Sequence, residues 1–341
     1  MTRSLRRSAR IAAQSALMMI LISTPTLASA ASGTPPRPKL GSAEYRLSWG
    51  VKASRATGVY RKGATGKGIV VAMIDTGVGP DAAGLFSDLS PHSIDLVPNR
   101  RFDTGDRRHG QQTASLLAAP VDGAGTFGIA YEATLLSIRA DRDGSCLRTC
   151  AFDPPLLAKA IDYALDHGAS VIGMPMASRR AIQAIEPALE RAAKRGVVIV
   201  AAAGNDGDDQ PVWPARYATD PRFASSMLVS GAATLQGRMA PWSNKAGATR
   251  SRYVVAPGEY VVVDCGERSC SLVSGTSYSV AYTAGAIALL LSRAPHLSGP
   301  QAASMLLQSA DDLAERGTDH LTGRGRLNVG RAIRAVQEAK G

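Results

Sequence analysis

Short, continuous apolar runs alternate with stretches of helical periodicity along most of this 341-residue chain, and this alternation limits the possible folds. A run of four to six apolar residues is typical of a β-strand that is buried on both faces. Strands of this kind that alternate with helices indicate a parallel sheet covered by helices. We therefore predict an α/β fold, a three-layer, doubly wound and mostly parallel sheet with helices on both faces.

The predicted strands are rich in β-branched residues, and the predicted helices carry apolar residues three and four positions apart. The strands are 69–74, 134–138, 170–174, 197–202, 227–231, 253–256 and 259–264. The helices are 109–119, 154–167, 181–195, 277–293, 301–310 and 329–336. The helix over 277–293 is apolar almost all round, which predicts that it lies buried.

The first 30 residues have the layout of a secretory signal peptide. Four arginines precede an apolar run over 11–22, and Ala28-Ser29-Ala30 has the pattern of a cleavage site. Cleavage after Ala30 removes these four arginines and lowers the formal net charge from +11 to +7. We expect an exported protein, periplasmic or extracellular, with a flexible leader over 31–45 and one folded domain over 46–341. No membrane span is expected after cleavage.

The remaining positive charge is scattered and forms no basic stripe interleaved with aromatic residues, so it does not indicate a nucleic-acid partner. One local cluster comprises Arg100, Arg101, Arg107 and Arg108. A solvated loop is the simpler interpretation of this cluster, and attraction of acidic substrates is the alternative. We expect the protein to be a monomer.

Export would place the four cysteines in an oxidising compartment, where disulfide bonds form. Four cysteines allow three pairings, and sequence alone does not choose among them. Pairing Cys146 with Cys150 and Cys265 with Cys270 is the simplest, because each pair lies in a turn-rich segment. Neither spacing is Cys-x-x-Cys and no histidine lies close by, so no metal site is predicted from the cysteines.

Polar residues follow two predicted strands at their carboxyl ends, where an open parallel sheet gathers its catalytic groups. They are Asp75-Thr76-Gly77 and Gly204-Asn205. Two other motifs open predicted helices, His109-Gly110 and Gly275-Thr276-Ser277. Each motif alone is commonly a turn, a helix cap or a solvated side chain.

Together, and in the order Asp, His, Asn, Ser, these motifs resemble those of the subtilisin-like serine proteases. The resemblance extends over residues 45–337 and rests on the segments 71–78, 109–115, 202–205 and 274–277. It implies a subtilisin-like fold and a serine endopeptidase that hydrolyses peptide bonds of protein or peptide substrates through an acyl-enzyme. Asp75, His109 and Ser277 would form the triad, with Asn205 in the oxyanion hole.

Each implied role has a chemical reason. A serine hydroxyl is a weak nucleophile until a base removes its proton, and His109 would be that base. Asp75 would fix the tautomer of His109 and stabilise its charged form. Ser277 at a helix N-terminus would have backbone N–H groups beside it, and these would bind the oxyanion together with the Asn205 amide.

The segment expected to bind substrate departs from the family pattern, which has Ser-Leu-Gly after the methionine. Here Met174 is followed by Pro175, Met176 and Ala177. Pro175 has no N–H, and Ala177 adds a methyl group where glycine allows close approach. With Ala202, Ala203 and Gly204 opposite, we predict a narrowed or shifted pocket and weak activity on general substrates.

Two further departures lie beside the predicted triad. Gln111-Gln112 follows the histidine motif where threonine is usual, and Tyr278 follows Ser277 where methionine or phenylalanine is usual. The segments 43–50 and 63–68 resemble the subtilisin-like domains of bacterial autotransporters, which place a cysteine pair at Cys146 and Cys150. Because the chain ends at Gly341, we expect a member without the barrel.

Calcium is the one candidate cofactor, because loops of this family often bind it. The candidate ligands are two acidic groups: Asp141 with Asp143, and Asp206, Asp208 and Asp209. Acidic turn residues are also common without any metal, so both groups have a plain structural interpretation.

Two alternative functions remain open. The first is an aspartic protease, because Asp75-Thr76-Gly77 and Asp103-Thr104-Gly105 are two copies of that family's triplet. No buried strand precedes the second copy, which argues against this alternative. The altered pocket favours the other alternative, a catalytically weak or inactive subtilisin-like scaffold that acts as a binding protein.

Overall fold

The structure, a computed structural model, describes residues 37–79, 86, 88–100, 108–147, 150–266 and 269–338. The chain divides into the units Met1–Pro35 and Pro36–Gly341, and only the second contains described residues. The predicted signal peptide, the Asp103 triplet, Arg101 and Arg107 lie outside the described residues.

Within the described residues, a seven-stranded parallel sheet forms the centre of the unit Pro36–Gly341. Its order is β2-β3-β1-β4-β5-β6-β7, and the chain reverses its progress across the sheet at β1, which lies between β3 and β4. Open α/β sheets bind ligands at such a switch point, beside the carboxyl ends of the strands. The strands are β1 (Val70–Asp75), β2 (Ile94–Asp95), β3 (Thr134–Arg139), β4 (Val171–Met174), β5 (Val198–Ala202), β6 (Met227–Ala233) and β7 (Tyr253–Pro257).

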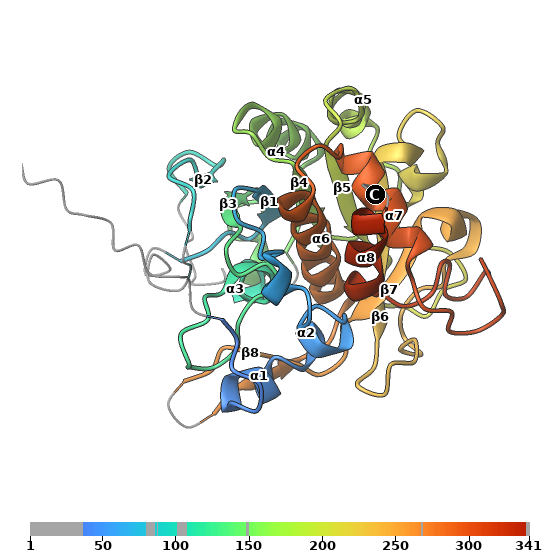
Figure 1. The fold of residues 1–341 in the computed structure, drawn as a ribbon. Coiled ribbons are helices and arrows are strands. Elements are labelled where there is room, and N and C mark those ends of the chain that lie inside the picture. The colour runs from blue at the N-terminus through green and yellow to red at the C-terminus, as the bar shows by residue number, and fades with distance from the viewer. Residues whose placement is uncertain are drawn as a thin grey trace, which may run out of the picture. The chain divides into compact units, whose positions relative to one another are not determined.

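Helices cover both faces of this sheet (Figure 1). On one face, α6 (Thr276–Arg293) lies against strands β4 to β7 and is buried along nearly its whole length. The same face carries α3 (Arg108–Ala118), α7 (Gly299–Gln308) and α8 (Val329–Glu338), and the opposite face carries α4 (Pro154–Asp166) and α5 (Glu186–Lys194). The predicted three-layer α/β fold is therefore confirmed.

The strands reach both cores because successive side chains of a strand point to opposite faces. In β1, Val71 and Met73 belong to the core with α6, whereas Ala72 and Ile74 belong to the core with α4. All four are at most 2% exposed. Burial on both faces explains why the strands appear in the sequence as unbroken apolar runs.

The predicted element bounds agree with the structure to within two residues, except for the helix over 181–195. This segment starts with a 3₁₀ turn, η4 (Gln183–Ile185), and α5 begins only at Glu186. Pro187 explains the later start, because proline has no N–H for a helix interior but fits the first helical turn.

Two short helices, α1 (Ala43–Leu47) and α2 (Trp49–Ala53), precede the sheet and were not predicted. The first begins within the range expected to be a flexible leader. Glu44 is 3% exposed, and its Oε1 accepts hydrogen bonds from the backbone N–H groups of Asp122 and Gly123 at 3.0 and 3.1 Å. These contacts attach α1 to the domain.

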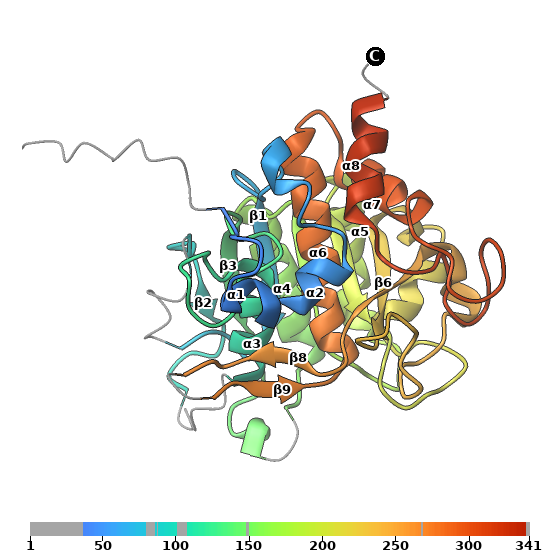
Figure 2. The same ribbon diagram turned by 60° about the horizontal axis from the view of Figure 1, so that its bottom comes forward.

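An antiparallel hairpin leads directly into α6. It consists of β8 (Val261–Val263) and β9 (Ser271–Val273), and β8 contacts α3 (Figure 2). The hairpin therefore lies beside both helices that carry predicted triad residues.

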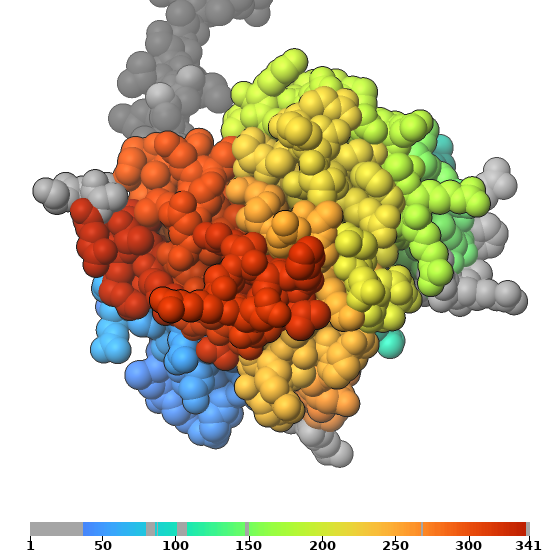
Figure 3. Space-filling view, turned by 90° about the vertical axis from the view of Figure 1, so that its right-hand side faces the viewer, coloured from blue at the N-terminus to red at the C-terminus, as the bar shows by residue number. Residues whose placement is uncertain are grey.

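The segment between α7 and α8 covers the connection from β6 to β7. The backbone N–H groups of Ala246 and Gly247 donate to the carbonyls of Leu321 and His320 at 3.0 and 2.9 Å. Figure 3 shows this red C-terminal segment against the gold one. None of the helices within the described ranges is long and apolar enough to cross a membrane.

Candidate active site

Asp75 and His109 lie in direct contact at the switch point of the sheet. Asp75 is the last residue of β1 and is 2% exposed. Nδ1 of His109 lies 2.8 Å from Oδ1 and 3.0 Å from Oδ2 of this carboxylate. The His109 side chain is 34% exposed, so its ring reaches from a buried carboxylate toward the surface.

Two further donors hold the Asp75 carboxylate in place. The backbone N–H of Thr76 donates to Oδ1 at 2.7 Å, and the hydroxyl of Thr113 donates to Oδ2 at 2.9 Å. A buried charged group is tolerated only when such partners replace water. The hydroxyl of Thr76 in turn accepts the N–H of Gly110 at 2.9 Å, which ties the first turn of α3 to the end of β1.

Glycine at position 110 makes this close approach possible. A Cβ atom there would lie 2.4 Å from the carbonyl oxygen of Gly77, which is backbone and cannot move aside cheaply. Gly77 itself has a φ of +78°, in the left-handed region that favours glycine. The two glycines therefore allow α3 to bring His109 against Asp75.

Ser277 lies in the first turn of α6 and is partly exposed. Its hydroxyl donates to the carbonyl oxygen of Pro175 at 3.0 Å. In this conformation the hydroxyl proton is directed at the end of β4 and not at His109.

Asn205 follows β5 and is linked to the same helix start. Its Oδ1 accepts the backbone N–H and the hydroxyl of Thr276, both at 2.9 Å. The Thr276 hydroxyl also accepts the N–H of Gly204 at 3.1 Å. Because Oδ1 is occupied, Nδ2 is the atom with which the exposed Asn205 can donate to a ligand.

The two segments predicted to bind substrate lie side by side, because they end the neighbouring strands β4 and β5. The first is 174–177 and the second is 202–204. Val212, which was not predicted, lies beside the second segment, and its N–H donates to the carbonyl of Ala203 at 2.8 Å. A Cβ on Gly204 would lie 3.0 Å from Cγ1 of Val212. No local sequence pattern predicts this contact. The neighbouring residue Trp213 forms a β-bridge with Ser178, which is distant in the sequence.

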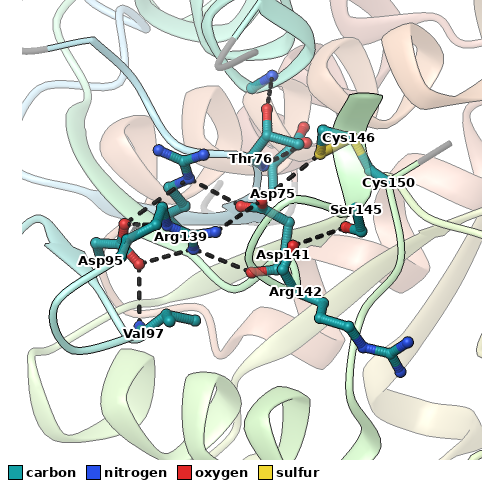
Figure 4. Close-up of polar contacts among 12 residues, drawn as sticks. Asp75, Thr76, Asp95, Val97, Arg139, Asp141, Arg142, Ser145, Cys146 and Cys150 are labelled. Carbon is teal, nitrogen blue, oxygen red and sulfur yellow. Dashed lines mark hydrogen bonds and ion pairs between the residues drawn. A yellow bond between two sulfur atoms is a disulfide. The ribbon is translucent and has the colours of Figure 1, made fainter. Parts of the chain in front are cut away.

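A buried ion-pair cluster lies beside Asp75 (Figure 4). Nε of Arg100 lies 2.7 Å from Asp95 and its Nη1 lies 3.0 Å from Asp141, while Nε of Arg139 lies 2.8 Å from Asp141. Arg139 is also the register partner of Asp75 across β1 and β3. The cluster thus connects the carboxyl ends of β2 and β3, next to the end of β1 where Asp75 lies.

The solvated-loop interpretation is wrong for Arg100. Its side chain is only 5% exposed, and Asp95 and Asp141 face its guanidinium from two sides. The two carboxylates beside it also balance its charge. These ion pairs could not be predicted from the sequence, because neither acidic partner is next to Arg100 in the chain.

Three of the five candidate calcium ligands have basic partners. Asp141 is engaged by two arginines, and Lys245 contacts the carboxylate of Asp209. Asp206 lies 3.7 Å from Arg179. In the ranges that the structure describes, no group of three His, Cys, Asp or Glu side chains is arranged to hold a metal ion. Calcium binding therefore stays a prediction without a structural site.

The cysteines pair at short range. Cys146 is bonded to Cys150, and Cys265 is bonded to Cys270. The second disulfide closes the β8–β9 hairpin that leads to Ser277. The sulfur of Cys146 also lies 3.5 Å from Asp141, a contact without a proton because both sulfurs are in the disulfide.

Comparison with known proteins shows the family of this chain. The sequence profile of the subtilase family matches residues 66–325, so the chain belongs to this family of serine endopeptidases. It is 29% identical to subtilisin BL of Lederbergia lenta over 290 residues, which are 84% of this chain and 98% of that protein. It is 28% identical to the minor extracellular protease Epr of Bacillus subtilis over 283 residues, 81% of this chain and 40% of that protein.

The fold is also similar to that of the prenylagaramide maturation protease PagA. The TM-score is 0.65 at 25% sequence identity, and the match covers 82% of this chain and 97% of PagA. The predicted family, fold and enzyme class are confirmed. The resemblance to autotransporter domains stays a prediction.

Proposed function

We propose that this subtilase is exported and hydrolyses peptide bonds with Asp75, His109 and Ser277 as its catalytic triad. The observation that carries the proposal is the 2.8 Å contact between Nδ1 of His109 and the buried Asp75 carboxylate. This contact favours the tautomer with a proton on Nδ1, in which Nε2 of His109 carries the lone pair of a base.

The reaction takes place in two similar halves. Oγ of Ser277 attacks the carbonyl carbon of the scissile bond while Nε2 of His109 takes its proton. Nδ2 of Asn205 and the N–H of Ser277 donate to the oxyanion that forms. The intermediate collapses as His109 returns the proton to the leaving amine, and a water molecule then hydrolyses the acyl-enzyme by the same steps.

The hydroxyl of Ser277 must change its hydrogen bond for the first step. It leaves the carbonyl of Pro175 and turns its proton toward His109. One neutral hydrogen bond contributes about 0.5–1.5 kcal/mol net, so this exchange is a small part of any catalytic barrier. Catalytic hydrogen bonds often form fully only when substrate is bound.

The substrate-binding segments support a preference for small side chains next to the scissile bond. Met176 is 8% exposed and Val212 is 7% exposed, and Val212 packs against Gly204. Both side chains are therefore largely buried where the ends of β4 and β5 lie side by side. We therefore expect slow cleavage of general protein substrates.

Three observations support export. The first 30 residues have the pattern of a signal peptide. The four cysteines are joined in two disulfides, and disulfides persist in oxidising compartments. One relative, Epr, is named an extracellular protease.

Casein hydrolysis by residues 31–341 tests the proposed function. The wild-type protein should release peptides slowly, with small residues at the new C-termini. Ser277→Ala and His109→Ala should release none while keeping the wild-type melting temperature. A folded wild-type protein that is as inactive as Ser277→Ala would instead support the alternative of a binding scaffold.

A further inference from the structure

A chain of polar side chains connects the three segments around the predicted triad. The hydroxyl of Tyr278 donates to Oε1 of Gln112 at 2.9 Å, and Nε2 of Gln112 donates to Oδ2 of Asp264. Tyr278 and Gln112 are 7% and 4% exposed, whereas Asp264 lies at the surface. The chain therefore runs from the core beside the site out to the β8–β9 hairpin.

Each link is next to a residue that the mechanism uses. Tyr278 directly follows Ser277 on α6, and its ring centroid lies 5.7 Å from that of His109. Gln112 lies three residues after His109, which places both on the same side of α3. Asp264 directly follows β8 and precedes Cys265 of the hairpin disulfide.

The chemistry of the groups fixes the direction of the chain. A carboxylate only accepts hydrogen bonds, so Gln112 must turn its amide N–H groups toward Asp264. Its carbonyl oxygen then faces Tyr278, which must donate. Burial, together with the charges of Asp75 and Asp264, raises the pKa of Tyr278 to about 12, so the hydroxyl keeps its proton at neutral pH.

The outer end of the chain is held by the backbone. Asp264 has a φ of 48°, a left-handed conformation that is uncommon for a residue with a side chain. The next residue, Cys265, is joined to Cys270 by a disulfide, and the carboxylate of Asp264 accepts a hydrogen bond from Gln112. A carboxylate held in this way gives Gln112 a fixed partner.

A buried polar chain is costly unless every member has a partner, and here each described contact supplies one. Apolar side chains would fill the same space without linking α3, α6 and the hairpin. We propose that Tyr278, Gln112 and Asp264 are positioning residues that hold His109 and Ser277 in register for proton transfer. This inference rests on the proposed triad and adds residues that act through it.

Tyr278→Phe is the main test, because it removes the hydroxyl and keeps the ring. Tyr282→Phe is the matched control, since Tyr282 is a buried tyrosine one turn later on α6 whose hydroxyl bonds no described residue. A displacement of about 1 Å between reacting groups lowers a rate about 100-fold. For the smaller displacement expected here, kcat should fall about tenfold in Tyr278→Phe with KM within twofold of wild type, and should not change in Tyr282→Phe.

Asp264 offers a test that leaves the core unchanged. Asp264→Ala removes the acceptor at the surface, whereas Asp264→Asn keeps an oxygen that can accept from Gln112. We expect Asp264→Ala to lower kcat about as much as Tyr278→Phe and Asp264→Asn to restore most of it. The kcat of the double variant Tyr278→Phe/Asp264→Ala should be no lower than that of either single variant, because each substitution alone already interrupts the same series of hydrogen bonds.

Two results would overturn the inference while the proposed function stands: wild-type kcat in both Tyr278→Phe and Asp264→Ala, or additive losses in the double variant. A folded wild-type protein without activity would instead overturn the proposed function, and the inference with it. Melting temperatures identify any variant that loses activity by unfolding.

Discussion

Asn205 has two separate tasks that a single substitution can distinguish. Its Oδ1 accepts from Thr276 and so helps to fix the start of α6, while its Nδ2 is the proposed donor to the oxyanion. Only the second task concerns the reaction itself.

Asn205→Asp should keep the acceptor and lose the donor. We expect kcat to fall by about 100- to 1000-fold, the usual effect of losing one oxyanion-hole donor, while KM changes little. Steady-state kinetics on a peptide substrate measures both. Asn205→Ala is the comparison that loses both tasks. A kcat in Asn205→Asp within threefold of wild type would contradict the proposed role of Nδ2.

Individual residues differ in how well the sequence predicts their place in the site. Asp75, His109, Asn205 and Ser277 could be predicted as site residues because each lies in a short motif. Tyr278 was noticed only as a departure from such a motif, because its partner Gln112 is 166 residues away in the sequence. Side-chain partners that distant leave no local pattern.

At the scale of elements, the sequence predicted nearly all strands and long helices, because burial on both faces leaves unbroken apolar runs. It missed β2, which has two residues, and β9, whose residues are largely exposed. Neither strand carries an apolar run of useful length. The start of α5 was misplaced because the apolar period continues through the 3₁₀ turn, η4.

The two disulfides close loops of similar size, with sequence separations of 4 and 5, but lie in different parts of the fold. Chain entropy alone gives each about 2 kcal/mol of stabilisation. The Cys146→Ser/Cys150→Ser and Cys265→Ser/Cys270→Ser variants should therefore lose similar unfolding free energy in urea titrations. Only the second should also lose activity at a temperature where both are folded, since Cys265 adjoins Asp264. Equal activity losses in both variants would argue against a special role for the hairpin.

At the scale of the whole molecule, buried tyrosines predict a loss of stability in alkali. Burial raises the pKa of Tyr60, Tyr253 and Tyr282 well above the ordinary value of 10. Their contribution to the unfolding free energy is fully present below pH 10. It is lost as the pH rises further, because the unfolded chain releases protons that the folded chain keeps. Burial lowers the pKa of Arg252 to about 10, which opposes the effect of one tyrosine.

Unfolding free energy measured from pH 9 to pH 11.5 tests this balance. Each tyrosine adds a slope of up to about 1.4 kcal/mol per pH unit, so three tyrosines outweigh one arginine and stability should fall. Tyr282→Phe should make the decline shallower by one such increment. A flat profile, or a decline that Tyr282→Phe leaves unchanged, would show that these tyrosines do not set the alkaline limit.

Covalent labelling tests whether Asp75 and His109 activate Ser277. A fluorophosphonate would be added to residues 31–341, and the modified peptide would be located by mass spectrometry. Ser274 and Ser279 are internal controls, because they lie close to Ser277 in the sequence but outside the proposed triad. We expect label on Ser277 alone, and none when His109 is replaced by alanine. Label spread over the three serines, or label on Ser277 that survives His109→Ala, would contradict it.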